Sequence, residues 1–209
     1  MPQRSVLILD DFYDEPMAVR DLALSLEFRP KDDAMYPGGE AYSNAMDWES
    51  VRQRIIGELG AGSVETPIPG KNFAQGKFRL AMKQHEKTRP DAVHQDTQRY
   101  SAIVYLAHDA DCVGGVGLYQ CKLSGQTSMN LKWFNMLSEK FGVGIKDPDF
   151  ATLVKNYCLD WSNWTQIGEL PMRFNRLIVL MARCFHASTG IFGNDAASGR
   201  LTQHFEIYL

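Results

Sequence analysis

The stretch His94-Gln-Asp-Thr-Gln-Arg-Tyr-Ser-Ala-Ile-Val-Tyr-Leu106 places a polar triplet ahead of a mostly apolar run. Residues 100–106 are rich in β-branched and aromatic side chains, which is typical of a buried β-strand. In extended backbone, side chains at positions i and i+2 project from the same face. The imidazole of His94 and the carboxylate of Asp96 are therefore predicted to reach one point together, close to the start of a strand.

Further short strands are predicted on both sides of this stretch. Residues 77–83 alternate polar with apolar side chains, and so do residues 200–207 at the end of the chain. The remaining predicted strands are residues 5–9, 94–96, 116–120, 161–167, 176–181 and 184–188. Strands this short and closely spaced are typical of an antiparallel barrel or sandwich.

Helices are predicted before the strands and within them. The first predicted helix is capped by Asp14, has Pro16 in its first turn and runs to residue 26. A second helix, residues 48–59, is predicted after the cap Asp47. A third, residues 129–141, is predicted between the cap Thr127 and the terminating Gly142, and a fourth opens at Asp147-Pro148 and runs to about residue 158. Residues 60–76 are rich in Gly and Pro and are predicted to form a connection.

Length and composition favour a single domain. The chain has 209 residues, of which 44% are hydrophobic, enough for one substantial core. We expect residues 1–74 to supply an N-terminal strand and supporting helices, and residues 75–209 to form the barrel core, with a helical insertion at about residues 121–160.

Charge and cysteine content bear on partners and compartment. The net charge of -3 provides no basic field that would attract nucleic acid. There is no apolar span of membrane length, and the N-terminal apolar run turns acidic at Asp10-Asp11, too early for a signal peptide. The four cysteines show no C-x-x-C spacing, which favours reduced thiols in a cytoplasmic protein. A small molecule or a peptide is the expected partner, with no nucleic acid and no membrane.

His186 is the best candidate for a third ligand beside His94 and Asp96. It lies just beyond a strongly apolar predicted strand, and in a barrel residues remote in sequence become neighbours when their strands pair. Two histidines and one carboxylate form the facial triad of non-haem Fe(II) sites. A histidine two residues before an aspartate also arises often by chance, so a hydrogen-bonded surface pair remains an alternative.

The last predicted strand adds a candidate anion site. Arg200 and Thr202 share one strand face, where a guanidinium and a hydroxyl can hold a carboxylate together. An exposed charge on an edge strand is the alternative for Arg200. His204 lies on the same face, and a hydrogen-bonded core or surface histidine is its favoured interpretation.

In sequence order, these features resemble the Fe(II)/2-oxoglutarate-dependent oxygenases. The resemblance rests on His94-x-Asp96, the strand at 100–106 with Gly114-Gly115 after it, residues 175–180, His186 and Arg200-x-Thr202. It is strongest with the prolyl-4-hydroxylase-like branch and an uncharacterised bacterial group within it. The resemblance implies a mainly β chain with supporting helices, built on a double-stranded β-helix of the jelly-roll or cupin-like type.

The resemblance also implies an activity and roles for residues. His94, Asp96 and His186 match the iron ligands of the family, Arg200 matches the residue that binds the far carboxylate of 2-oxoglutarate, and Thr202 matches a hydroxyl often found two positions later. The expected reaction uses O2 to hydroxylate an unactivated C–H bond of a small molecule or of a peptide or protein side chain, with succinate and CO2 as co-products. Asp96 favours hydroxylation, because related halogenases have a small residue at its position.

Two departures from the family pattern argue against assuming a prolyl substrate. The insertion at residues 121–160 is longer than a minimal barrel needs, and many prolyl hydroxylases have lysine at the position of Arg200. Two other classes of function remain open: a non-catalytic cupin-like module that binds a metal or another ligand, and a metal-dependent enzyme that does not use 2-oxoglutarate.

Overall fold

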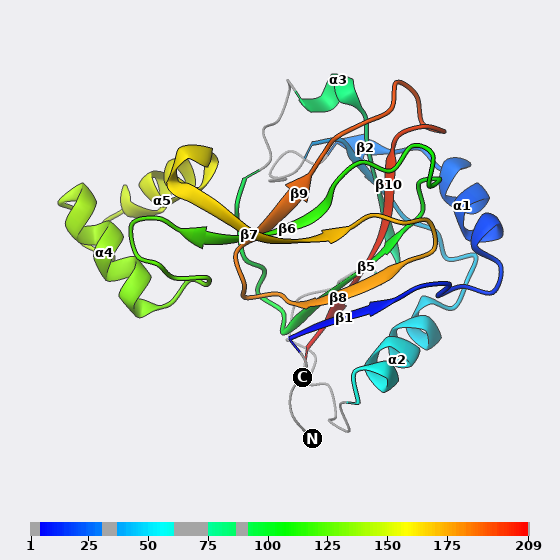
Figure 1. Ribbon diagram of the computed structural model, residues 1–209, viewed down its shortest axis with the longest axis horizontal. Helices are drawn as coiled ribbons and strands as arrows, with labels where there is room; N and C mark the ends of the chain where they lie inside the picture. Colours follow the sequence, from blue (N-terminus) through cyan, green and yellow to red (C-terminus); the bar gives the residue numbers. More distant parts are fainter. Residues whose placement is uncertain (1–4, 31–36, 61–74, 87–91, 209) are drawn as a thin grey trace.

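The computed structural model describes residues 5–30, 37–60, 75–86 and 92–208, in which two antiparallel sheets face each other (Figure 1). The larger sheet has the order β1 (Val6–Leu9), β8 (Leu177–Met181), β5 (Tyr100–Tyr105), β10 (Arg200–Ile207), β4 (Lys77–Ala81), β3 (Gly39–Ala41) and β2 (Arg29–Pro30). The smaller sheet has the order β7 (Trp164–Pro171), β6 (Gly115–Cys121) and β9 (His186–Thr189).

The order in which the chain visits the two sheets makes this a jelly roll. From β4 the chain passes through a single bridge at His94 beside the smaller sheet and returns to the larger sheet as β5. It then forms β6 and β7 in the smaller sheet, β8 in the larger, β9 in the smaller and β10 in the larger. The predicted double-stranded β-helix with supporting helices is confirmed.

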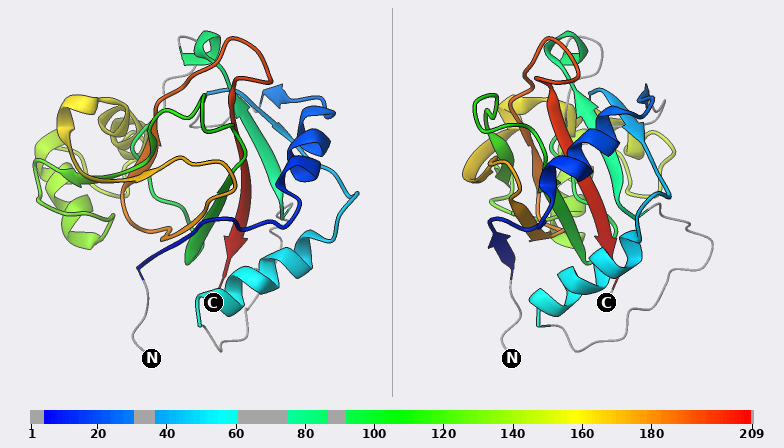
Figure 2. Two further views of the ribbon diagram at one scale, coloured as in Figure 1. Left: turned by 45° about the vertical axis from the view of Figure 1, so that its right-hand side comes forward. Right: turned by 90° about the vertical axis from the view of Figure 1, so that its right-hand side faces the viewer.

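Alternation along the strands divides the core into layers. One face of the larger sheet packs Phe78, Leu201 and Phe205 against α1 (Pro16–Leu24) and α2 (Trp48–Glu58), which cover its outer side (Figure 2). The opposite face packs apolar side chains of β5 and β8 against β6 and β7, between the sheets. A third cluster joins the smaller sheet to α4 (Leu131–Phe141) and α5 (Phe150–Leu159).

Some helix ends agree with the sequence and others do not. Asp47 caps α2 by accepting from the Ser50 amide at 3.1 Å, and Gly142 ends α4 with φ of 66°, both as predicted. Asp14 and Thr127 do not cap: α1 starts after Glu15 without a side-chain cap, and Asn130 caps α4. Besides these helices, the described chain contains the short helices α3 (Lys83–Glu86) and η1 (Trp161–Asn163). None of the helices in the described ranges combines the length and the hydropathy of a membrane span.

Further boundaries also differ from prediction. The helix expected to open at Asp147 begins at Phe150, because the Asp147 carboxylate accepts from the Asp149 amide in a turn ahead of the helix. The strand expected at residues 161–167 begins at Trp164, after η1, and its ladder with β6 extends it to Pro171. The strand expected around His94 is a single bridge to His186. Of the connection predicted for residues 60–76, residues 61–74 lie outside the described parts of the chain.

Candidate metal centre

Backbone pairing brings the two predicted histidine ligands together. His94 and His186 form an antiparallel bridge, in which each amide donates to the other's carbonyl at 3.0 and 2.8 Å. The Asp96 amide is anchored on the Ala182 carbonyl at 2.8 Å. One ligand atom from each of His94, Asp96 and His186 lies within 4.8 Å of the other two. We call these three residues the candidate triad.

The hydrogen bonds of the two imidazoles define which ring nitrogens face Asp96. His94 Nδ1 lies 2.8 Å from the Ala92 carbonyl, and His186 Nδ1 lies 2.8 Å from the Cys184 carbonyl. A carbonyl oxygen only accepts, so each Nδ1 donates and each Nε2 of a neutral ring carries a lone pair. These Nε2 atoms lie 3.8 Å and 3.4 Å from the Asp96 carboxylate oxygens. Acceptor atoms facing one another this closely call for a cation between them.

The donor set fits a first-row divalent metal. Neutral imidazole nitrogens and a carboxylate are ligands of non-haem iron, and ligating histidines ordinarily donate their other ring N–H to a carbonyl or carboxylate. Burial alone would raise the pKa of Asp96, but when a proton rather than a metal sits on the Nε2 atoms, the hydrogen bond from His186, the positive charges of both rings and the Ser101 hydroxyl together hold that pKa well below its ordinary value. The carboxylate is therefore ionised and ready to bind a cation.

Two polar side chains hold the Asp96 carboxylate in place. Ser101 Oγ donates to Asp96 Oδ2 at 2.6 Å, and Gln98 Nε2 donates to the same oxygen at 3.1 Å. Gln98 also donates to Ser101 Oγ at 2.7 Å, and both side chains are buried. Oδ2 is thus engaged by two donors, whereas Oδ1 faces His94 Nε2.

A cavity of about 750 Å³ adjoins the candidate triad. Both sheets contribute to its lining, and so does α5 of the helical insertion, through Ala151, Val154 and Lys155. Apolar side chains such as Ile103 and Val116 line the space between the sheets. The cavity is therefore large enough for more than one small ligand beside a metal.

Arg200 lines this cavity and Thr202 does not. Arg200 is buried, with 7% of its surface exposed, and donates from Nη2 to the Gly115 carbonyl at 2.9 Å. Thr202 is fully buried on the same strand face, with Oγ1 2.9 Å from His204 Nε2. His204 lines the cavity, and burial together with the cations Arg79 and Lys77 lowers its pKa well below the ordinary value. His204 is therefore a neutral, hydrogen-bonded histidine.

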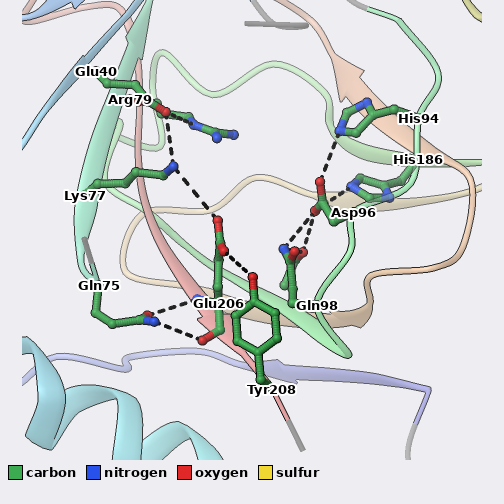
Figure 3. Close-up of polar contacts among 11 residues, drawn as sticks. Glu40, Gln75, Lys77, Arg79, His94, Asp96, Gln98, His186, Glu206 and Tyr208 are labelled. Atoms are coloured by element: carbon green, nitrogen blue, oxygen red, sulfur yellow. Dashed lines mark hydrogen bonds and ion pairs between the residues drawn. The ribbon is translucent and has the colours of Figure 1, made fainter. Parts of the chain in front are cut away.

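A group of charged side chains covers the inner face of the larger sheet near the candidate triad (Figure 3). It consists of Glu40 on β3, Lys77 and Arg79 on β4, and Glu206 on β10, and we call it the charged wall. Glu40 Oε1 lies 3.2 Å from Arg79 Nε and 3.3 Å from Lys77 Nζ. Lys77 Nζ is 3.9 Å from Glu206 Oε1. In Figure 3, Lys77 and Arg79 extend from β4 toward the side where the candidate triad lies.

A family model described as a family of unknown function, DUF6445, matches residues 1–207. The chain belongs to this family. No curated protein matches the DUF6445 chain significantly. Among solved structures, it is similar to a selenomethionine-labelled Fe(II)/α-ketoglutarate-dependent dioxygenase, TqaL, with 9% sequence identity and a TM-score of 0.42, over 97% of this chain and 82% of that one. The prolyl-4-hydroxylase-like branch stays a prediction.

Sequence reasoning did not find every polar residue at this DUF6445 site. The sequence predicts Ser101 within an apolar strand, and its hydroxyl at one position of that buried run is the signal for a polar contact. The charged wall was missed because its members are spread over three strands, from Glu40 to Glu206. The sequence shows that the charged residues of β4 and β10 alternate with apolar ones. It does not show which face of these strands points toward the inside of the sandwich.

Proposed function

We propose that this protein is an Fe(II)- and 2-oxoglutarate-dependent dioxygenase that hydroxylates an unactivated C–H bond of a small molecule or of a peptide or protein side chain. The observation that carries the proposal is the convergence of three acceptor groups, from His94, Asp96 and His186, on a cavity that also contains the buried guanidinium of Arg200. A purely structural cluster has no need for this combination.

In this proposal, Nε2 of His94, Nε2 of His186 and the Asp96 carboxylate hold the iron. Bound there, iron supplies O2 activation coupled to oxidative decarboxylation of 2-oxoglutarate, so that substrate C–H, O2 and 2-oxoglutarate yield substrate C–OH, succinate and CO2. The protein keeps both imidazoles in the ligating tautomer through the carbonyls of Ala92 and Cys184. Ser101 and Gln98 keep the carboxylate oriented.

Arg200 is proposed to bind the far carboxylate of 2-oxoglutarate through its planar fork of donors. Its Nη2 bonds the Gly115 carbonyl, and Gly115 pairs with Thr189, three residues beyond His186 on β9. Three residues of strand span roughly 10 Å, a reach suited to a five-carbon dicarboxylate. The hydroxyl of Thr202 does not line the cavity, so its proposed donation to the same carboxylate requires it both to leave His204 and to turn toward the cavity.

The decisive experiment combines binding with turnover. Anaerobic addition of Fe(II) and 2-oxoglutarate to the wild type should produce the weak visible charge-transfer band of the chelate, and admission of air should release succinate. Asp96→Ala should abolish both signals, whereas Asp149→Ala, which removes an exposed carboxylate at the start of α5, should retain them.

Two results would contradict the proposal. Absence of both signals in the wild type would rule out the dioxygenase, and so would their persistence in Asp96→Ala. A stable complex with metal and 2-oxoglutarate that never releases succinate would instead support the non-catalytic cupin-like module.

A further inference from the structure

The charged wall occupies a place where sandwich cores are ordinarily apolar. Arg79 pairs with Thr202 and Lys77 with His204 across the β4–β10 ladder, while Glu40 pairs with Arg79 on the other side. On the neighbouring part of the same sheet, β5 and β8 contribute apolar side chains to the space between the sheets. Burying charges costs free energy unless they are well paired or serve a ligand.

Pairing within the charged wall is uneven. One oxygen of Glu40 lies close to both cations, at 3.2 Å from Arg79 Nε and 3.3 Å from Lys77 Nζ. Glu206 Oε1 has Lys77 Nζ only at 3.9 Å, and its Oε2 accepts from the neutral Tyr208 hydroxyl at 2.9 Å. Burial raises the pKa of Glu206 and Asp96 adds to this, against the lowering effects of the Tyr208 hydroxyl and of the cations Lys77 and Arg79. Of the two carboxylates, Glu206 therefore has the weaker cationic partner.

Glu206 is also held rigidly and faces the cavity. The backbone of Glu206 is held on both sides by the Gln75 side chain. The Glu206 amide donates to Gln75 Oε1 at 3.0 Å, and the Glu206 carbonyl accepts from Gln75 Nε2 at 3.1 Å. Its side chain lines the cavity and retains 16% exposure. A carboxylate at a cavity wall whose anionic form burial still disfavours gains from a further cationic ligand group.

The position of Glu206 separates it from the proposed 2-oxoglutarate anchor. Arg200 and Glu206 lie on one face of β10, six residues apart, which corresponds to roughly 20 Å of strand. Glu206 pairs with Ser101, the residue that bonds Asp96, whereas Arg200 bonds Gly115. A group bound at Glu206 would thus lie on the Asp96 side of the cavity, away from Arg200.

We propose that Glu206 is a specificity-determining residue that binds a protonated alkylamine of the substrate. The hydroxylation that would follow amine binding rests on the proposed function. In that reaction, the bound amine would position a nearby C–H bond of the substrate at the metal. A primary ammonium offers three N–H donors and a positive charge, which match the Glu206 carboxylate, and it would compete there with Lys77 Nζ, which lies 3.9 Å from Glu206 Oε1. The amine belongs either to a free small molecule or to a lysine side chain of a peptide.

The test compares amines with uncharged analogues of the same length. Full-length protein is loaded anaerobically with Fe(II) and 2-oxoglutarate and titrated by calorimetry. The ligand pairs are n-butylamine against 1-butanol, and the N-acetylated tripeptide acetyl-Gly-Lys-Gly against its norleucine analogue, in which the side chain carries no amine. We expect each amine to bind more tightly than its analogue, and Glu206→Gln to weaken amine binding by about tenfold. The tighter of the two amines identifies the source.

Controls keep the result interpretable. Glutamine preserves an acceptor for Tyr208, and Glu139→Gln, which neutralises an exposed carboxylate on α4, should bind amines as the wild type does. Equal binding of amine and analogue by the wild type, absence of amine binding, or unchanged binding in a folded Glu206→Gln would overturn the inference. If Glu206→Gln does not fold, the wild-type comparison alone decides. Loss of succinate release with intact amine binding would refute the dioxygenase but not the amine site.

Discussion

Ser101 Oγ donates a hydrogen bond of 2.6 Å to Asp96 Oδ2, and this bond links the centre of the larger sheet to the candidate triad. Ser101 is on β5, between strands that belong to the rigid core, and only 6% of its surface is exposed. A charge-assisted hydrogen bond from so constrained a donor orients the carboxylate before any metal arrives.

Ser101→Ala should therefore weaken metal binding while leaving the fold intact. Loss of a contact to a ligating carboxylate typically costs about ten- to a hundredfold in metal affinity. Mn(II) titration by calorimetry measures the effect. Ser25→Ala is the control, because Ser25 is exposed and its hydroxyl donates to the Leu22 carbonyl at the end of its own helix. Unchanged Mn(II) affinity in Ser101→Ala would show that Asp96 does not depend on this contact.

His186→Ala should remove a ligand outright. Because the Nε2 atoms of both histidines face Asp96, we expect iron affinity to fall by more than about a hundredfold, beyond the effect of an outer contact. Metal analysis after equilibrium dialysis checks this, and His108→Ala is the matched control, since its ring packs on Phe174. Stoichiometric iron in His186→Ala would exclude His186 from the ligand set.

Arg200→Lys keeps the positive charge but loses the planar fork. We expect the KM for 2-oxoglutarate to rise by about tenfold, corresponding to one lost charged hydrogen bond, with iron binding unchanged. Succinate release at varied 2-oxoglutarate measures the KM, and Arg183→Lys on the exposed surface serves as control. Loss of iron with an unaltered KM would assign Arg200 a structural role instead.

Asp10 contributes a pH-dependent increment of stability. Hydrogen bonds and charges from Arg176 and Arg173 outweigh desolvation and lower the pKa of Asp10 below 3.8. A depressed carboxyl pKa stabilises the fold above the ordinary value and loses that contribution as the pH falls through the folded value. Since these groups are partly exposed, Asp10→Asn should cost less than about 1 kcal/mol at neutral pH.

Urea unfolding of wild type and Asp10→Asn measures this increment. The difference in the free energy of unfolding should be present at neutral pH and should vanish when the pH is well below the ordinary pKa of an aspartate. A difference that is the same at both pH values would mean that the ion pairs with Arg173 and Arg176 do not cause it.

The sequence by itself determined the local features of this protein. Alternation defined β10 with its bounds and placed Arg200, Thr202 and His204 on one face, as the structure has them. The spacing of His94 and Asp96 was enough to predict that they reach one point, and a capping aspartate and a terminal glycine located helix ends at Asp47 and Gly142. These features depend only on residues close to one another along the chain. Their geometry follows from the periodicity of a strand or a helix.

Only the tertiary structure decided which distant residues meet. The bridge between His94 and His186, the contact of Ser101 with Asp96 and the neighbourhood of Glu40 and Glu206 all depend on strand order and register. One residue of slip would turn every side chain of a strand to the opposite face. Register is determined by the packing of both sheets together, so no single segment of sequence contains it.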